Sequence, residues 1–157
     1  MSGSPSGCLA PMILSRAALL LLLSLAAARA DECDALASRI AAATGTRIAH
    51  REGPGVDFRG PGGLSLDVTC RADPIVAARS SERSPSAAYF EAIARAAALA
   101  IGESPERLSA AFRSAYGEAQ GRPNGGVVRE NGWQASCYVD PRGSVRTLCS
   151  AGRIPRE

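Results

Sequence analysis

The sequence predicts an α+β fold, in which two three-stranded antiparallel meanders, which could form one sheet, carry three helices packed on a face. Two patterns predict it: three segments repeat apolar residues with helical spacing, and several short segments alternate apolar and polar residues. Turn signals rich in Gly and Pro separate the short segments. The resulting order of one helix, three strands, two helices and three strands favours helices laid on an antiparallel sheet.

The first 30 residues have the features of a cleaved secretion signal. Arg16 supplies a positive charge, residues 17–25 form an almost unbroken apolar run, and Ala28 and Ala30 are small residues at the positions that signal peptidase recognises. The apolar run is too short for a transmembrane helix, which needs about 20 apolar residues. We therefore expect a periplasmic or secreted protein that has no membrane span in its mature form.

The mature chain is expected to comprise residues 31–157 and to form a single small disulfide-stabilised domain. Met1 and Met12 are alternative starts that give the same mature product. All 18 basic residues are Arg, and two of them leave with the leader, so that 16 Arg face 15 acidic residues. This near-balance argues against a nucleic acid or an anionic membrane as the partner, because such partners require a clustered surplus of positive charge.

Cysteine usage agrees with export. Cys8 leaves with the leader, and an even set of four cysteines in an oxidising compartment predicts two structural disulfides. Three pairings are open. The chain has no C-x-x-C pair and only one histidine, so we expect no zinc site and no thioredoxin-like redox site. The four cysteines are Cys33, Cys70, Cys137 and Cys149.

The first part of the mature chain predicts a short helix followed by a meander. Apolar residues recur with helical spacing over residues 34–43, and Gly45 can end that helix in a left-handed conformation. In the last extended segment apolar and polar residues alternate, which points Cys70 into the core. The three extended segments are 46–51, 56–59 and 64–71.

The middle of the chain predicts two helices separated by Gly102. One runs from about residue 85 to 101, and the other from about residue 105 to 116. Ser84-Pro85 and Ser104-Pro105 each place a capping hydroxyl before a proline at the first helical position, where the missing N–H costs nothing.

The last third predicts a second meander. Residues 127–130 and 133–140 flank Asn131-Gly132, a strong signal for a two-residue hairpin, and a third strand covers residues 144–150. With a tight second turn, Cys149 would lie diagonal to Cys137, at about 7–8 Å, which is too far for an unstrained disulfide. A looser turn would bring the two cysteines level, so their pairing stays open.

Catalytic chemistry has few candidates. His50 stands at the end of a predicted strand, where a general acid or base is one interpretation and a solvated strand end is the favoured one. A carboxylate pair could hydrolyse glycosides, but the acidic residues are dispersed and alternate with Arg, as on an exposed strand face. No phosphate, dinucleotide or calcium motif occurs, so no cofactor and no metal are expected. The carboxylates considered are Asp57, Asp67, Asp73, Glu130 and Asp140.

Trp133 is the first candidate for binding. It follows a tight turn, where an aromatic side chain can cap the core, which is the favoured role, or dock a partner. Basic residues surround it in the sequence and could form a cationic face or protect an edge strand against aggregation. We predict a binding role for Trp133 with Arg129, Arg142 and Arg146, which Arg122 and Arg153 accompany.

These features favour a small exported binding or interaction protein, for which an inhibitor or an envelope accessory factor would fit. Its partner would be an envelope or extracellular protein or a polysaccharide. The rival prediction is a small secreted hydrolase that uses His50 or a carboxylate pair. A third is an accessory subunit whose partner completes its sheet.

Overall fold

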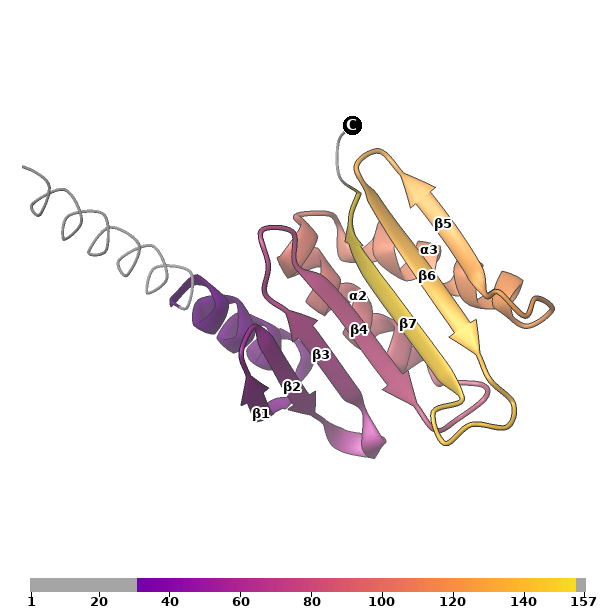
Figure 1. The fold of residues 1–157 in the computed structure, drawn as a ribbon, viewed down its shortest axis with the longest axis horizontal. Helices are drawn as coiled ribbons and strands as arrows, with labels where there is room; N and C mark the ends of the chain where they lie inside the picture. The colour runs from indigo at the N-terminus through magenta and orange to yellow at the C-terminus, as the bar shows by residue number, and fades with distance from the viewer. Residues whose placement is uncertain (1–30, 155–157) are drawn as a thin grey trace, which may run out of the picture. The chain divides into compact units, whose positions relative to one another are not determined.

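The computed structural model describes residues 31–154, and the predicted secretion signal lies outside that part of the chain. Seven antiparallel strands form one sheet in the order β1-β2-β3-β4-β7-β6-β5 (Figure 1). The strands are β1 (Arg47–Glu52), β2 (Gly55–Arg59), β3 (Ser65–Thr69), β4 (Ile75–Ser80), β5 (Gly126–Glu130), β6 (Trp133–Val139) and β7 (Thr147–Arg153).

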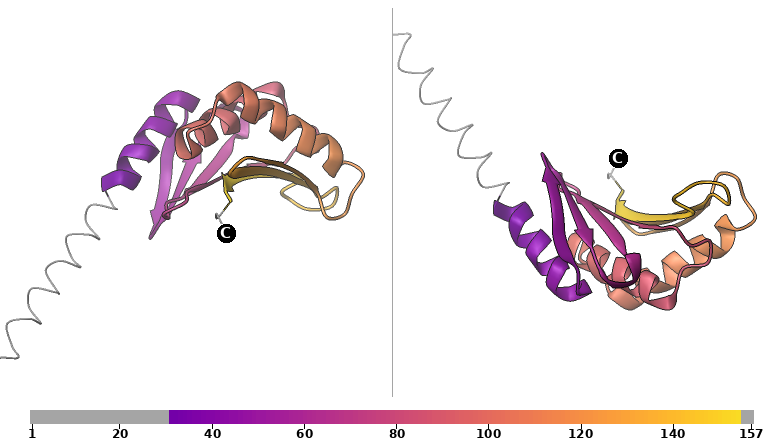
Figure 2. Two further views of the ribbon diagram at one scale, coloured as in Figure 1. Left: turned by 90° about the horizontal axis from the view of Figure 1, so that it is seen from above. Right: turned by 90° about the horizontal axis from the view of Figure 1, so that it is seen from below.

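The helices lie on one side of this sheet, and no described element covers the other side (Figure 2). Helix α2 packs against β4 and β7, and α3 packs against β6 and β5. The α+β class is thereby confirmed, and the two predicted groups of strands join into a single sheet where β4 pairs with β7. The helices are residues 31–44, α2 (Ala87–Ile101) and α3 (Pro105–Ala119), and a 3-10 turn, η1 (Pro61–Gly63), precedes β3.

The first meander has four strands, so the prediction of three was wrong. The missed strand, β4, reads Ile-Val-Ala-Ala-Arg-Ser, and three successive residues in it, Val76 to Ala78, are buried. A strand in the middle of the sheet buries small side chains on both faces, and it therefore lacks the alternation by which a half-buried strand is recognised.

Of the two predicted serine caps, one is confirmed and the other is wrong. At α3, the Ser104 hydroxyl accepts a hydrogen bond from the Arg107 N–H at 3.2 Å, and Gly102 ends α2 in a left-handed conformation. At α2, the helix begins at Ala87, two residues after the predicted start. Ser86 takes the capping position there without a side-chain cap bond.

The second meander confirms the Asn131-Gly132 hairpin, because Gly132 has a positive φ of 84° and strands β5 and β6 pair directly around it. Strand β7 begins at Thr147 and not at residue 144. Residues 140–146 form a loop, which is closed by a hydrogen bond from the Asp140 N–H to the Arg146 carbonyl at 2.9 Å.

This wide loop determines whether Cys137 can pair with Cys149. It brings Cys137 directly opposite Cys149, and the two form a disulfide with an S–S distance of 2.06 Å. Cys33 and Cys70 are also disulfide-bonded. Two disulfides indicate folding in an oxidising environment. Within residues 31–154, no helix has the length and apolar character needed to cross a membrane.

Candidate functional site

The predicted binding residues do not form one cluster. Trp133 begins β6 and faces the helices, whereas Arg129 pairs with Gln134 and therefore points to the opposite side of the sheet. Arg142 and Arg146 lie in the loop at the far end of β6. Trp133 and the three arginines are close in the sequence but are not close together in the structure.

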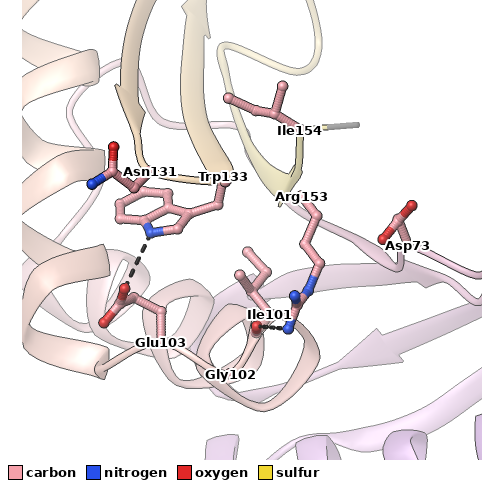
Figure 3. A pocket seen from close by; sticks show the side chains of 9 residues that line it. Asp73, Ile101, Gly102, Glu103, Asn131, Trp133, Arg153 and Ile154 are labelled. Atoms are coloured by element: carbon pink, nitrogen blue, oxygen red, sulfur yellow. Dashed lines mark hydrogen bonds between the residues drawn. The ribbon is translucent and has the colours of Figure 1, made fainter. Parts of the chain in front are cut away.

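Trp133 lines a cavity of about 370 Å³ at one end of the sheet (Figure 3). The cavity lies between the end of α2, the turn before β6 and the end of β7. The Trp133 side chain is only 4% exposed, and its Nε1 donates a hydrogen bond to Glu103 Oε2 at 3.2 Å. The ring therefore covers the core, which is the role that the sequence favoured. The other lining residues are Asp73, Ile101 to Glu103, Asn131, Gly132, Arg153 and Ile154.

Two charged side chains that line this cavity, Glu103 and Arg153, are held by hydrogen bonds. Glu103 accepts hydrogen bonds from the Ser104 N–H and from Arg107 Nη1, both at 2.8 Å, in addition to the one from Trp133. The bond from Ser104 does most to lower the pKa of Glu103, with smaller contributions from Trp133 and Arg107, so the carboxylate stays ionised. Arg153 Nη2 donates to the last carbonyl of α2, that of Ile101. The arrangement fastens the ends of β6 and β7 to the α2–α3 turn.

The larger candidate surface is the side of the sheet that no described helix covers, which we call the open face. Its side chains follow directly from the strand register, because alternate residues of each strand point to it. Read from β5 to β1, they form three rows across the sheet: Tyr138, Leu148, Arg79, Ser65, Arg59 and Arg47; then Val127, Ser136, Ser150, Ala77, Asp67, Asp57 and His50; then Arg129, Gln134, Gly152, Ile75, Thr69, Gly55 and Glu52.

One half of the open face is nearly uncharged. It carries four large apolar side chains that are 37–46% exposed, and Tyr138 stands directly opposite Leu148. Small residues lie between them, and the Ile75 side chain leans over Gly152, at whose position an added Cβ would meet Ile75 Cγ1 at 3.3 Å. We call this surface the apolar patch, and its members are Ile75, Val127, Tyr138 and Leu148.

The other half, on β1, β2 and β3, is charged. His50 is opposite Asp57, and Asp57 is opposite Asp67. Arg79 lies 3.0 Å from Asp67 and so pairs with it. The pKa of Asp67 is raised, chiefly by burial and further by the negative charge of Asp57, against the opposing effects of Arg79 and Arg59.

Three of the predicted catalytic candidates, His50, Asp57 and Asp67, thus lie next to one another across strands β1 to β3. The side chain of His50 is 65% exposed, and its Nε2 lies 3.9 Å from the Glu52 carboxylate. That is the solvated strand end favoured from the sequence, and the hydrolase stays an alternative prediction. Among the residues described, no three His, Cys, Asp or Glu side chains gather as metal ligands would.

The remaining predicted carboxylates lie elsewhere. Glu130 pairs with Arg107 at 3.1 Å, Asp140 accepts the Arg142 N–H at 2.9 Å inside its loop, and Asp73 lines the Trp133 cavity. They therefore do not join Asp57 and Asp67.

The apolar patch was not predicted, although a signal for it is present. Tyr138 follows Cys137 on β6, at a position where an alternating strand with one face in water carries a polar residue. Leu148 breaks the same rule on β7. Two apolar residues at outward positions of neighbouring strands are the sign of a surface patch.

The chain matches no protein-family model, no curated protein and no solved structure. Its function is therefore inferred from the chemistry and the placement of its own residues.

Proposed function

We propose that this chain is a small exported binding protein, periplasmic or secreted, that captures an envelope or extracellular protein on the open face of its sheet. The observation that carries the proposal is the apolar patch, in particular Tyr138 and Leu148 side by side on β6 and β7. Exposed groups of large apolar side chains mark interaction sites, because water contact with them is unfavourable until a partner covers them.

The surroundings of the patch favour a protein partner over a polysaccharide. Interfaces between proteins combine aromatic and aliphatic anchors at the centre with a polar rim, and Tyr and Arg are enriched in them. Here Arg79 and Arg129 flank the apolar patch, and Gln134, Ser136 and Ser150 offer neutral hydrogen-bonding groups inside the rim.

Export is supported by the two disulfides of the described residues, which need an oxidising compartment, together with the leader predicted from the sequence. The disulfides also suit a binding protein, because a sheet with one uncovered face has less core than a sheet covered on both faces and benefits from cross-links.

The experiment uses the purified, oxidised mature chain to capture proteins from the envelope and extracellular fractions. The test variant is Tyr138→Ser with Leu148→Ser. The matched control is Arg47→Ser, which changes the same row of the same face but at the far edge, on β1. We expect the double variant to bind the captured partner at least about tenfold more weakly, as for two central contacts, and the control to bind normally.

Equal capture by all three proteins would refute a role for the apolar patch. Trp133→Ala is not a suitable test of binding, because this side chain is buried and its loss would destabilise the fold.

A further inference from the structure

The two edges of the sheet differ in how they are protected. Edge strand β1 has six exposed residues, four of them charged or imidazole-bearing, and its register shifts between Ile48 and His50. Charges and bulges of this kind prevent an edge from pairing with another chain. Edge strand β5 pairs with β6 without a shift and carries Val127 and Val128 at its centre. The second edge has only two charged residues, Arg129 and Glu130, and no register shift, so it is less protected than the first.

The outward backbone groups of β5 can be identified from the register. The Cα atoms of Cys137 and Cys149 are 4.1 Å apart, the close spacing of a non-hydrogen-bonded pair. Hydrogen-bonded and non-hydrogen-bonded positions alternate along β6, so that Gly126, Val128 and Glu130 bond to β6. The N–H and C=O groups of Val127 and Arg129 then point away from the sheet. No backbone hydrogen bond found outside the strands of residues 31–154 reaches either residue.

We propose that β5 pairs antiparallel with β5 of a second copy of this chain, around a two-fold axis at Val128. In this register Val127 of one copy lies opposite Arg129 of the other, and each such pair exchanges two N–H···O bonds. The two Val128 side chains meet at a non-hydrogen-bonded position, where side chains are closest.

The side chains along this seam are compatible with a second copy. Arg129 meets Val127 and not another cation. Glu130 lies opposite Gly126, where Ala115 and Glu118 of α3 pack against the strand. On the helix side, Glu130 is already neutralised by Arg107 at 3.1 Å, and at the other end of α3 Glu118 is paired with Arg122 at 3.3 Å. The two-fold axis places the Glu130–Arg107 pair of one copy beside the Glu118–Arg122 pair of the other copy, so no charge is left uncompensated there.

Pairing in this way would continue the sheet across both copies and bring their open faces onto one surface. Val127 of each apolar patch then stands next to the seam. The dimer can be tested separately from the proposed partner, because Tyr138 and Leu148 lie on β6 and β7 and not on the paired strand β5.

The first test is sedimentation of the oxidised mature chain over a range of concentrations. We expect a dimer whose fraction rises with concentration. Arg129→Pro removes an outward N–H and leaves the bonds to β6 in place, since proline is tolerated on an edge strand when its nitrogen faces solvent. This variant should be monomeric, whereas Tyr138→Ser with Leu148→Ser should dimerise as the unmodified chain does.

The second test does not depend on whether Arg129→Pro folds. In the variant V128C the two introduced thiols would occupy the same kind of cross-strand position as Cys137 and Cys149, and they should form a disulfide between copies. The control is R129C, also on the edge, whose thiols would be diagonal and about 7–8 Å apart. A chain that is monomeric at every concentration, or equal cross-linking of V128C and R129C, would overturn the proposed dimer.

Discussion

The two faces of the sheet are built from the same strands but differ in how deeply their side chains are buried. On the face under the helices, Phe58, Leu66, Val68 and Ala135 are completely buried. On the open face, the neighbours of these residues in the sequence are charged, small or partly exposed. Because side chains alternate along a strand, each residue contributes either to the core or to the open face. The comparison predicts that substitutions on the open face leave the stability of this protein largely unchanged, so that the proposed binding can be altered separately.

The largest difference in stability between the two faces is expected for the truncation of one aromatic side chain on each. Phe112→Ala removes a fully buried ring from α3 and should lower the free energy of unfolding by about 3–5 kcal/mol. Tyr138→Ala removes a ring of similar size from the open face and should change it by about 0.5 kcal/mol or less. Urea unfolding of both variants measures the difference, and similar losses in the two would mean that the open face is covered in the free protein.

A second comparison uses neighbouring cross-strand pairs on β6 and β7. Replacing both Cys137 and Cys149 by alanine opens a short loop of the chain, with a sequence separation of 12, and should cost about 2–3 kcal/mol. On the open face, Ser136 and Ser150 have hydroxyl oxygens 3.0 Å apart. Replacing both by alanine should cost about 1 kcal/mol or less. Guanidinium unfolding without reductant compares the two double variants, and a larger loss from the serine pair would contradict the assignment.

The smallest effects concern pH. The pKa of Asp67 on the open face is raised above its ordinary 3.8, so stability should fall as the pH rises from 3.8 through the raised value. Asp67→Asn should remove this fall and stabilise the protein at neutral pH. The pKa of Glu103 is lowered, so its stabilisation is present above the ordinary carboxyl value and is lost as the pH falls through the lowered one.

Glu103→Gln should accordingly destabilise the protein at neutral pH and have no effect in strong acid. Thermal unfolding across the acidic range gives both profiles. If the two variants shifted stability in the same direction at neutral pH, the different environments assigned to Asp67 and Glu103 would be wrong.

The fold could be predicted where local chemistry decides the structure. The Ser104 cap, the left-handed Gly45 and the Asn131-Gly132 hairpin each depend on a few adjacent residues, and the structure contains all three. Strand β4 could not be predicted in this way, because burial on both sides of Ala77 and its neighbours follows from their place in the middle of the sheet.

The candidate site was harder to predict because it depends on pairing between distant strands. Arg129, Arg142 and Arg146 are near Trp133 in the sequence, but strand direction sends them to another face or to the opposite end of β6. Tyr138 and Leu148 became neighbours only through a loop whose length was not evident from its turn signal. That same loop set the Cys137–Cys149 pairing.

Strand β7 is the last regular element of the described chain, yet it sits between β4 and β6 in the centre of the sheet. An incomplete chain therefore has two separate groups of strands, each with a bare inner edge, and cannot close its core until Thr147 to Arg153 have been made and released. Such contacts between distant parts of a chain form slowly. Late insertion of this inner strand would keep a newly made chain open, which is the state that the predicted export across a membrane requires.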